Sequence, residues 1–199
     1  MKILIATKNQ GKVNEFKKIL SEYDVISAAD INIDAEVVED GETFFENAVK
    51  KATQIGKRSR MLTVADDSGL EVDYLNGQPG VYSARFAGEP SDSEKNIDKL
   101  LGLMEGVPAE KRGARFVCVL AAHFPDGKVI TTCGKCDGVI AAERAGDGGF
   151  GYDSVFYVPS LNKTLAQITD DEKNLISHRG RALEELKKVL RTEKTNESE

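Results

Sequence analysis

The chain opens with a short apolar run, Lys2 to Thr7, which predicts a β-strand. From Lys12 onward, the apolar residues recur at the three- and four-residue spacing of an amphipathic helix. The positions with this spacing are Val13, Phe16, Ile19, Leu20 and Tyr23. The sequence therefore predicts a strand, a loop and a helix as the first unit of the fold.

Two further helices are predicted by capping-box pairs, in which a Ser or Thr stands three residues before a Glu. One pair is Thr43 and Glu46, and the other is Ser91 and Glu94. The apolar stripes that follow them are Phe44, Phe45, Ala48, Val49, Ala52 and Ile55, and then Ile97, Leu100, Leu101 and Met104. A last helical pattern runs from Thr169 to Leu190, and a break is expected near Ser177 or Gly180.

Between these helices lie four strand-like segments. They are Leu62 to Ala65, the doubly apolar run Ala114 to Phe124, its partner Lys128 to Cys136, and part of Phe150 to Val158. Strands that alternate with helices indicate an α/β protein with a mixed sheet. The length of 199 residues suits one domain or two closely packed lobes. We expect one domain over residues 1–190 and a polar tail over 191–199 that frays.

The composition is that of a soluble globular protein, with 40% hydrophobic and 30% charged residues. The net charge of −6 argues against general affinity for nucleic acid, which requires clustered Lys and Arg. No apolar segment approaches the ~20 residues that cross a membrane, and Met1 to Thr7 is too short for a signal peptide. The expected location is the cytoplasm.

The three cysteines also fit that location, because an odd number in a sizeable chain argues against a disulfide framework. Cys133 and Cys136 have the CxxC spacing of zinc and redox sites, but no second CxxC pair exists. The pair lies in a strand-like run, so we interpret it as buried or edge-strand cysteine. His123 lies in an apolar strand and is interpreted as structural.

The most informative stretch is Asp66-Asp67-Ser68-Gly69-Leu70, which follows the apolar run that ends at Ala65. At the end of a strand, a carboxylate is held still and remains open to solvent and to a metal ion. The alternative is an Asp-rich turn, because Asp, Ser and Gly all favour turns.

Two segments could hold phosphate or metal near these acids. Thr7 to Lys12 lies between a strand and a helix start, where backbone N–H groups and two lysines can bind phosphate. It lacks the spacing of a Walker A loop. Glu36, Glu39, Asp40 and Glu42 precede the second helix and are either a source of a metal ligand or a solvated acidic loop. Lys50 and Lys51 are either phosphate partners or solvated lysines.

Two later segments have the features of a base site. Phe150-Gly151-Tyr152-Asp153 follows a glycine-rich run, where an aromatic ring can stack on a base and a carboxylate can accept from ring N–H groups. The alternative is a turn with Phe150 in the core. Ser177-His178-Arg179-Gly180-Arg181 places cations at a helix start, which the helix dipole disfavours and which therefore indicates ligand recognition.

Together these segments resemble the inosine triphosphate pyrophosphatases, the Ham1-like family. The resemblance covers residues 1–190, with four motifs in order. The motifs are Thr7 to Lys12, Asp66 to Leu70 continuing through Pro79 to Arg85, Phe150 to Asp153, and Lys173-Asn174 through Ser177-His178-Arg179. Members of this family have a mixed central sheet flanked by helices, with two lobes around a nucleotide cleft.

The resemblance implies a role for each motif. Asp67 looks like the metal-binding acid and general base, with Glu39 as its metal partner or Glu42 as the alternative. The triphosphate ligands would be Thr7, Lys8, Asn9, Gln10, Gly11, Lys12, Lys51 and Ser68. Phe150 would stack on the base, and the other base contacts would be Gly151, Tyr152, Asp153, Lys173, His178 and Arg179.

The activity implied is Mg²⁺-dependent hydrolysis of ITP, dITP and XTP to the monophosphate and pyrophosphate by a homodimer. Neither nucleic acid nor a membrane is an expected partner. A related alternative is a Maf-like pyrophosphatase that acts on pyrimidine or modified nucleotides, against which the Phe150 and His178 motifs argue. An alternative of another class is a catalytically idle nucleotide sensor, against which the intact Asp66 and Asp67 argue.

Overall fold

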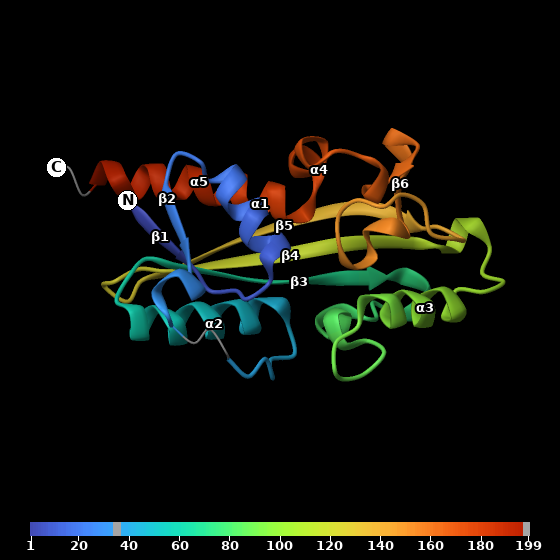
Figure 1. Cartoon of the computed structure of the whole chain (residues 1–199), viewed down its shortest axis with the longest axis horizontal. Coiled ribbons are helices and arrows are strands. Elements are labelled where there is room, and N and C mark those ends of the chain that lie inside the picture. Colours follow the sequence, from blue (N-terminus) through green and yellow to red (C-terminus); the bar gives the residue numbers. More distant parts are fainter. Residues whose placement is uncertain (34–36, 197–199) are drawn as a thin grey trace. The chain divides into compact units, whose positions relative to one another are not determined.

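The structure is a computed structural model of the 199-residue chain, and it describes residues 1–33 and 37–196. Within these residues a seven-stranded sheet has the order β2-β1-β3-β4-β5-β6-β7 (Figure 1). β1 pairs in parallel with β2 and β3, whereas β6 pairs in antiparallel fashion with β5 and β7. The predicted α/β fold with a mixed sheet is therefore confirmed.

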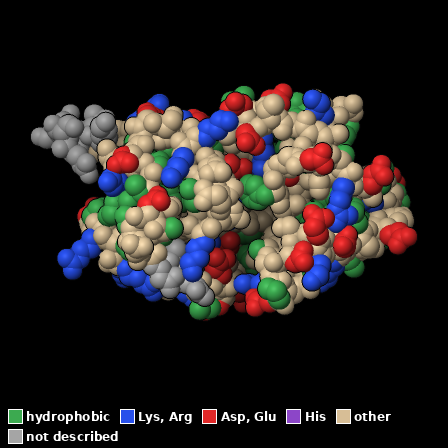
Figure 2. Space-filling view, in the orientation of Figure 1, with side chains coloured by type: hydrophobic (Ala, Val, Ile, Leu, Met, Phe, Trp, Pro, Cys, Tyr) green, Lys and Arg blue, Asp and Glu red, His purple; other side chains and the backbone are tan. Residues whose placement is uncertain are grey.

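The bounds of the elements are as follows. The strands are β1 Lys2–Ile5, β2 Asp24–Ser27, β3 Thr63–Val72, β4 Gly113–His123, β5 Val129–Ile140, β6 Phe156–Val158 and β7 Lys163–Thr164. The helices are α1 Gln10–Ile19, α2 Phe44–Ser59, α3 Ser93–Leu103, α4 Asp170–Ile176 and α5 His178–Asn196. None of the described helices is long and apolar enough to cross a membrane. Over the described surface drawn in Figure 2, acidic and basic side chains are interspersed.

The chain divides into two compact units. The first comprises residues 1–67, 118–134 and those from 178 onward. Its core has two parts because side chains alternate across the strands. Ile3 and Ile5 pack in a cluster with Phe16 of α1 and Leu186 of α5, whereas Leu4 packs in a cluster with residues of α2. Accordingly, α1 and α5 lie on one side of these strands and α2 on the other (Figure 1).

The second unit comprises residues 68–117 and 135–177. Its core joins the later half of β3 to α3 and to the strands that follow, through residues such as Leu70, Leu100 and Phe116. The ring of Phe116 lies 4.6 Å from that of Phe156, measured between centroids. This core supports the segment 150–154 that precedes β6, because Tyr152 belongs to it.

β3 is longer than the sequence predicted. The expected strand ends at Ala65, but β3 continues to Val72, so Asp66 and Asp67 lie inside a strand and not at its end. β1 is paired with β3 only as far as Ile5 and Val64. The two aspartates therefore lie just beyond the carboxyl end of the paired part of β1. Ligands bind at this position in many parallel sheets.

The predicted helix starts were correct in one case and displaced in the other. Thr43 caps α2, and the reciprocal capping box with Glu46 is present. For α3 the cap is Asp92, whose carboxylate accepts from the N–H groups of residues 94 and 95. Ser91 was wrong as a cap because its hydroxyl donates to the carbonyl of Ala84.

The structure also differs from the prediction in which residues of α2 are buried and in one additional strand. Phe45 was predicted to face the core, but it is 52% exposed, and Val49 is only partly buried. The buried face of α2 has Asn47 and Lys51 in their place. The predicted break at Ser177 is confirmed, since this residue separates α4 from α5. The four-residue strand β2 was not predicted.

Candidate active site

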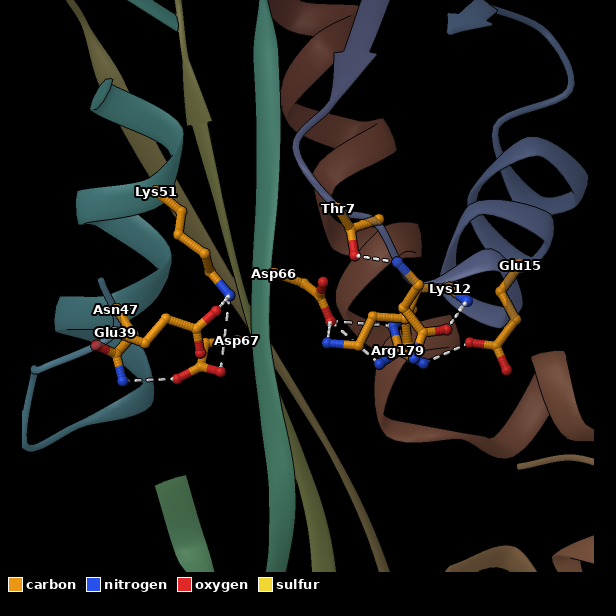
Figure 3. A network of polar contacts seen from close by, with 10 residues as sticks. Thr7, Lys12, Glu15, Glu39, Asn47, Lys51, Asp66, Asp67 and Arg179 are labelled. Atoms are coloured by element: carbon orange, nitrogen blue, oxygen red, sulfur yellow. Dashed lines mark hydrogen bonds and ion pairs between the residues drawn. The ribbon is translucent and has the colours of Figure 1, made fainter. Parts of the chain in front are cut away.

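Asp66 lies at the centre of a buried cluster between β3, α1 and α5 (Figure 3). The ammonium of Lys12 lies 2.8 Å from Oδ2 of Asp66. Nε and Nη2 of Arg179 donate to the same oxygen at 3.3 and 3.1 Å. Burial acts to raise the pKa of Asp66, but the charges of Lys12 and Arg179 outweigh burial and hold it well below its usual range. Asp66 is thus ionised throughout the physiological pH range.

Arg179 is held from two sides within this cluster. Its side chain is only 1% exposed, and Nη1 donates to the carboxylate of Glu15 on α1. Asp66 and Glu15 thus form an ion-pair network with Arg179 across the start of α5. The base-reading role that the resemblance implies for Arg179 remains a prediction.

The predicted phosphate loop forms the turn between β1 and α1. Asn9 caps α1 because its Oδ1 accepts from the backbone N–H of Lys12 at 3.1 Å. Thr7 Oγ1 in turn accepts from the N–H of Asn9 at 3.2 Å. Lys8, Asn9 and Gln10 are exposed, so this helix start faces solvent. Such a helix start attracts anions because its N–H groups and dipole point outward.

Asp67 points away from Asp66, to the side of β3 on which α2 lies (Figure 3). Two residues one helical turn apart contact its two oxygens. Asn47 Nδ2 donates to Oδ2 at 3.0 Å, and the ammonium of Lys51 lies 3.8 Å from Oδ1. Burial raises the pKa of Asp67 to about 6, with Glu39 adding to the rise and Lys51 opposing it.

Glu39 completes this second cluster, because its carboxylate accepts from Lys51 Nζ at 3.0 Å. Burial acts to lower the pKa of Lys51, but the neighbouring carboxylates, Asp66 and Asp67 foremost, outweigh burial and raise it. Lys51 is therefore charged, and two carboxylates converge on one cation. The acidic loop thus contributes one side chain to the cluster around Asp67.

The other acidic residues of that loop lie elsewhere. Asp40 forms an ion pair with Lys50. The side chain of Glu42, the alternative metal ligand, is exposed, and its backbone N–H donates to Glu46. Glu36 lies outside the described residues. Of the acidic-loop residues that the structure describes, Glu39 is the one that shares Lys51 with Asp67.

The carboxylates of Asp67 and Glu39 suit a hard divalent cation, because such cations prefer carboxylate oxygens and both groups lie within 4 Å of Lys51 Nζ. Among the described residues, no group of three or more His, Cys, Asp or Glu side chains is placed to hold a metal. Mg²⁺ commonly binds through one or two carboxylates, with phosphate oxygens and water as its other ligands. The residues therefore fit a Mg²⁺ ion that arrives with a phosphorylated substrate.

Asn47 was missed by sequence reasoning. Its side chain is 1% exposed and contacts Asp67 directly. The signal was present, because Asn47 and Lys51 are polar residues four positions apart on the apolar face of α2. A buried polar pair at this spacing requires partners.

A separate cluster in the second unit contains three of the predicted base residues, Phe150, Asp153 and Lys173. The ammonium of Lys173 lies 2.7 Å from Asp153 Oδ2 and 4.4 Å from the centroid of the Phe150 ring. The same carboxylate accepts from the backbone N–H of Phe150 at 2.8 Å. Phe150 is 36% exposed, so it is not the core residue of the alternative interpretation. Its ring is held on a buried ion pair and is open to solvent.

The remaining predicted residues have varied surroundings. The hydroxyl of the buried Tyr152 donates to the carbonyl of Ser83 at 2.8 Å. His178 is buried at the first position of α5, and Ser68 is half-buried in β3. Gly151 is half-buried and has a positive φ of 59°. Their contacts with a substrate remain predictions.

Comparison with known proteins identifies the family. The sequence profile of the Ham1 family matches residues 3–189. The chain belongs to the Ham1 family. A relative from Desulforamulus reducens named dITP/XTP pyrophosphatase is 51% identical over 192 residues, which cover 96% of each chain. One of the same name from Bacillus subtilis is 50% identical over 189 residues, covering 94% of this chain and 96% of its own.

Solved structures of Ham1 proteins have the same fold as this chain. The Ham1 protein of Staphylococcus aureus is 45% identical with a TM-score of 0.87, and the match covers 97% of this chain and all of that one. A HAM1 protein from Coxiella burnetii has the same TM-score at 38% identity, over 96% of this chain and 99% of its own. The resemblance to the Ham1-like family is therefore confirmed, and the family is not the Maf-like alternative.

Proposed function

We propose that this chain hydrolyses the deaminated purine nucleoside triphosphates ITP, dITP and XTP to the monophosphate and pyrophosphate. The names of the relatives support this proposal, because dITP/XTP pyrophosphatases are about 50% identical along nearly the whole chain. The observation that carries it is the buried Asp67, whose carboxylate shares the ammonium of Lys51 with the carboxylate of Glu39. This arrangement suits a charged phosphate ester that arrives with a divalent cation.

In the proposal, residues on the α1 side of β3 bind phosphate and residues on the α2 side bind the metal ion. The exposed N–H groups at the start of α1, together with Lys8, bind phosphate oxygens. Lys12 lies next to them and is oriented by Asp66. Asp67 and Glu39 would hold Mg²⁺, which when bound would neutralise phosphate charge and acidify coordinated water. Lys51 adds a positive charge at the same place. Ser68 follows Asp67 directly in β3 and contacts the same phosphates.

Asp67 acts as the general base in this proposal. Water attacks the α-phosphorus, a new P–O bond forms, and the bond from the α-phosphorus to the bridging oxygen breaks. Pyrophosphate leaves with the electron pair of that bond, and Asp67 takes the proton of the attacking water. In the metal-free protein, burial raises the pKa of Asp67, so its carboxylate is a stronger base than an exposed aspartate.

The base preference would come from Phe150 and the donor-rich residues. A 6-keto purine presents an acceptor at O6 and a donor at N1, whereas adenine presents the reverse. Lys173, His178 and Arg179 supply donors, with Asp153 as the acceptor, and Phe150 stacks on the ring. A buried donor that is left unpaired costs ~1–3 kcal/mol, so two mismatches would give about a hundredfold preference or more.

The resemblance also supports a homodimer and a cytoplasmic location as parts of the proposal. Cytoplasmic nucleotide pools are where deaminated triphosphates would need removal.

The test is a hydrolysis panel with the purified full chain. The substrates are ITP, dITP, XTP, GTP and ATP, each with Mg²⁺ or with EDTA, and phosphate is measured separately from pyrophosphate. We expect pyrophosphate from the three deaminated substrates with Mg²⁺ and little turnover in EDTA. Release of phosphate, or equal rates with ATP, contradicts the proposal. Sedimentation velocity of the same preparation tests the homodimer.

A further inference from the structure

Asn47 occupies an unusual place for its residue type. It is 1% exposed in the first half of α2, on the face where Phe44, Ala48 and Ala52 are buried. Asn has a low helix propensity, and its amide is costly to bury unless it is fully hydrogen-bonded. The cap of α2 is already made by Thr43 and Glu46, so capping does not account for the Asn47 side chain.

The amide of Asn47 joins two segments that are far apart in sequence. Its Nδ2 donates to Asp67 Oδ2 at 3.0 Å and lies 3.4 Å from the carbonyl oxygen of Gly41. Its Oδ1 accepts from the N–H of Gly41 at 2.8 Å. Both donor and acceptor sides of the amide are therefore in use. The donor side contacts β3 and the turn that follows Glu39, and the acceptor side contacts the same turn.

The turn fits closely against this amide. A Cβ atom at Gly41 would lie 2.7 Å from Asn47 Oδ1 and 2.8 Å from Cβ of Glu46. Both distances are shorter than atoms tolerate, so any larger residue must push the turn away from Asn47. The close approach of this backbone therefore depends on the glycine.

Lys51 extends the same arrangement by one helical turn. It lies four residues after Asn47, and its ammonium faces Asp67 Oδ1 and Glu39 (Figure 3). The two side chains from α2 thus contact different oxygens of one carboxylate. A carboxylate held at both oxygens has a defined rotation, which a single contact does not provide.

We propose that Asn47 is a positioning residue that fixes the Asp67 carboxylate and ties to it the turn carrying Glu39. Its amide makes the two carboxylates a single preformed unit. This inference deepens the proposed function and rests on it for the role of Asp67. Asn47 itself need not touch substrate.

The experiment compares Asn47→Ala and Asn47→Leu with Thr43→Ala. Leu has the same number of side-chain heavy atoms and the same branching as Asn but lacks its amide, so it separates side-chain shape from hydrogen bonding. Thr43→Ala weakens α2 without contacting Asp67 and should lower the melting temperature by ~2–4 °C. Each variant is assayed with dITP for kcat and KM, and Mn²⁺ binding to the substrate-free protein is measured by electron paramagnetic resonance.

We expect both Asn47 variants to lower kcat at least tenfold, with KM within about threefold of the wild type. Mn²⁺ affinity should fall at least fivefold in both, whereas Thr43→Ala should keep kcat and Mn²⁺ affinity within twofold. Gly41→Ala, which disturbs only the turn side, should weaken Mn²⁺ binding in the same direction. It also provides the test if an Asn47 variant does not fold.

Asn47→Leu with kcat and Mn²⁺ affinity close to the wild type would overturn the inference, because packing alone would then suffice. Equal losses in Thr43→Ala would overturn it as well, since the effect would be general to α2. A wild-type protein that releases no pyrophosphate from dITP contradicts the proposed function instead. In that case, the Mn²⁺ affinities of the four variants still decide the role of Asn47.

Discussion

Asp66 and Asp67 are consecutive residues of β3, yet their carboxylates face opposite sides of the strand and opposite electrostatic surroundings (Figure 3). Asp66 meets Lys12 and Arg179, and its pKa is held well below the usual range. Asp67 is also buried, but the nearby carboxylate of Glu39 adds to the effect of burial, and its pKa is raised to about 6. Neighbours in sequence thus have opposite roles in stability.

The first prediction is that Asp67→Asn abolishes turnover and stabilises the metal-free protein at pH 7.5. A raised pKa means that folding favours the protonated carboxyl. Its contribution to stability is therefore present below the unfolded pKa and is lost as pH rises through about 6. Above that pH the ionised group costs at most ~3 kcal/mol, by the usual conversion of a pKa shift. Asn removes that charge, so the melting temperature in EDTA should rise.

Asp66→Asn is the matched control, with the opposite expected sign. Its lowered pKa stabilises the fold above the unfolded pKa, and that contribution is lost only as pH falls through the depressed folded value. Replacement leaves the half-buried Lys12 and the buried Arg179 next to a neutral side chain, so the melting temperature at pH 7.5 should fall. Scanning calorimetry of both variants in EDTA checks the pair. Shifts of the same sign would contradict these assignments.

The sequence predicted elements wherever local chemistry decides the structure. The capping box at Thr43 and the break at Ser177 follow from residues close together in the chain, and both are confirmed. The extent of β3 did not follow, because Asp66 and Asp67 disfavour strands and are tolerated through partners on α1, α2 and α5. Residues that far apart in sequence are brought together only by the fold.

The same reasoning explains what was missed in the candidate site. The polar types at Asp67 and Lys51 are visible in the sequence, but the amide of Asn47 becomes informative only when its partner on β3 is known. The burial of Arg179 depends on Glu15 of α1, which is 164 positions away in the chain. Single-sequence patterns indicate candidate residues, whereas side-chain partners require the tertiary structure.

The second prediction concerns stacking by Phe150. Because its ring is 36% exposed and rests on the Lys173–Asp153 pair, Phe150→Ala should raise KM for ITP. Loss of one stacked base costs ~1–3 kcal/mol, or about 5- to 150-fold in affinity. Binding of inorganic tripolyphosphate, which has no base, should barely change. Phe45→Ala is the control, because Phe45 is an exposed phenylalanine on α2. Equal losses for ITP and tripolyphosphate would argue against stacking.

The third prediction distinguishes two roles of Tyr152. Its buried hydroxyl donates to the Ser83 carbonyl, and Ser83 Oγ accepts from the N–H of Leu70 in β3 at 2.8 Å. Tyr152→Phe removes only the hydroxyl, so stability should fall by ~1–3 kcal/mol with KM for dITP nearly unchanged. A raised KM at an unchanged melting temperature would instead mean that the hydroxyl contacts substrate, as the resemblance implies.

The last prediction concerns Arg179, which has both a structural and an expected recognition role. Arg179 is 1% exposed, and its guanidinium pairs with Asp66 and Glu15, so Arg179→Ala removes a charged partner from each of these two carboxylates. The melting temperature should therefore fall, because breaking a buried ion pair destabilises strongly. If Arg179 also donates to the 6-keto edge, as the resemblance implies, the ITP-to-ATP ratio in kcat/KM should collapse.

The ratio separates the two roles. A general loss of stability lowers kcat/KM for ITP and ATP together, whereas lost recognition lowers kcat/KM for ITP more than for ATP. Glu15→Gln is the matched variant. It removes one partner of Arg179 and leaves the guanidinium on Asp66. We expect this variant to lower the melting temperature less than Arg179→Ala and to reduce the ratio only slightly. An unchanged ratio in Arg179→Ala, with a lowered melting temperature, would assign Arg179 to the support of Asp66 alone.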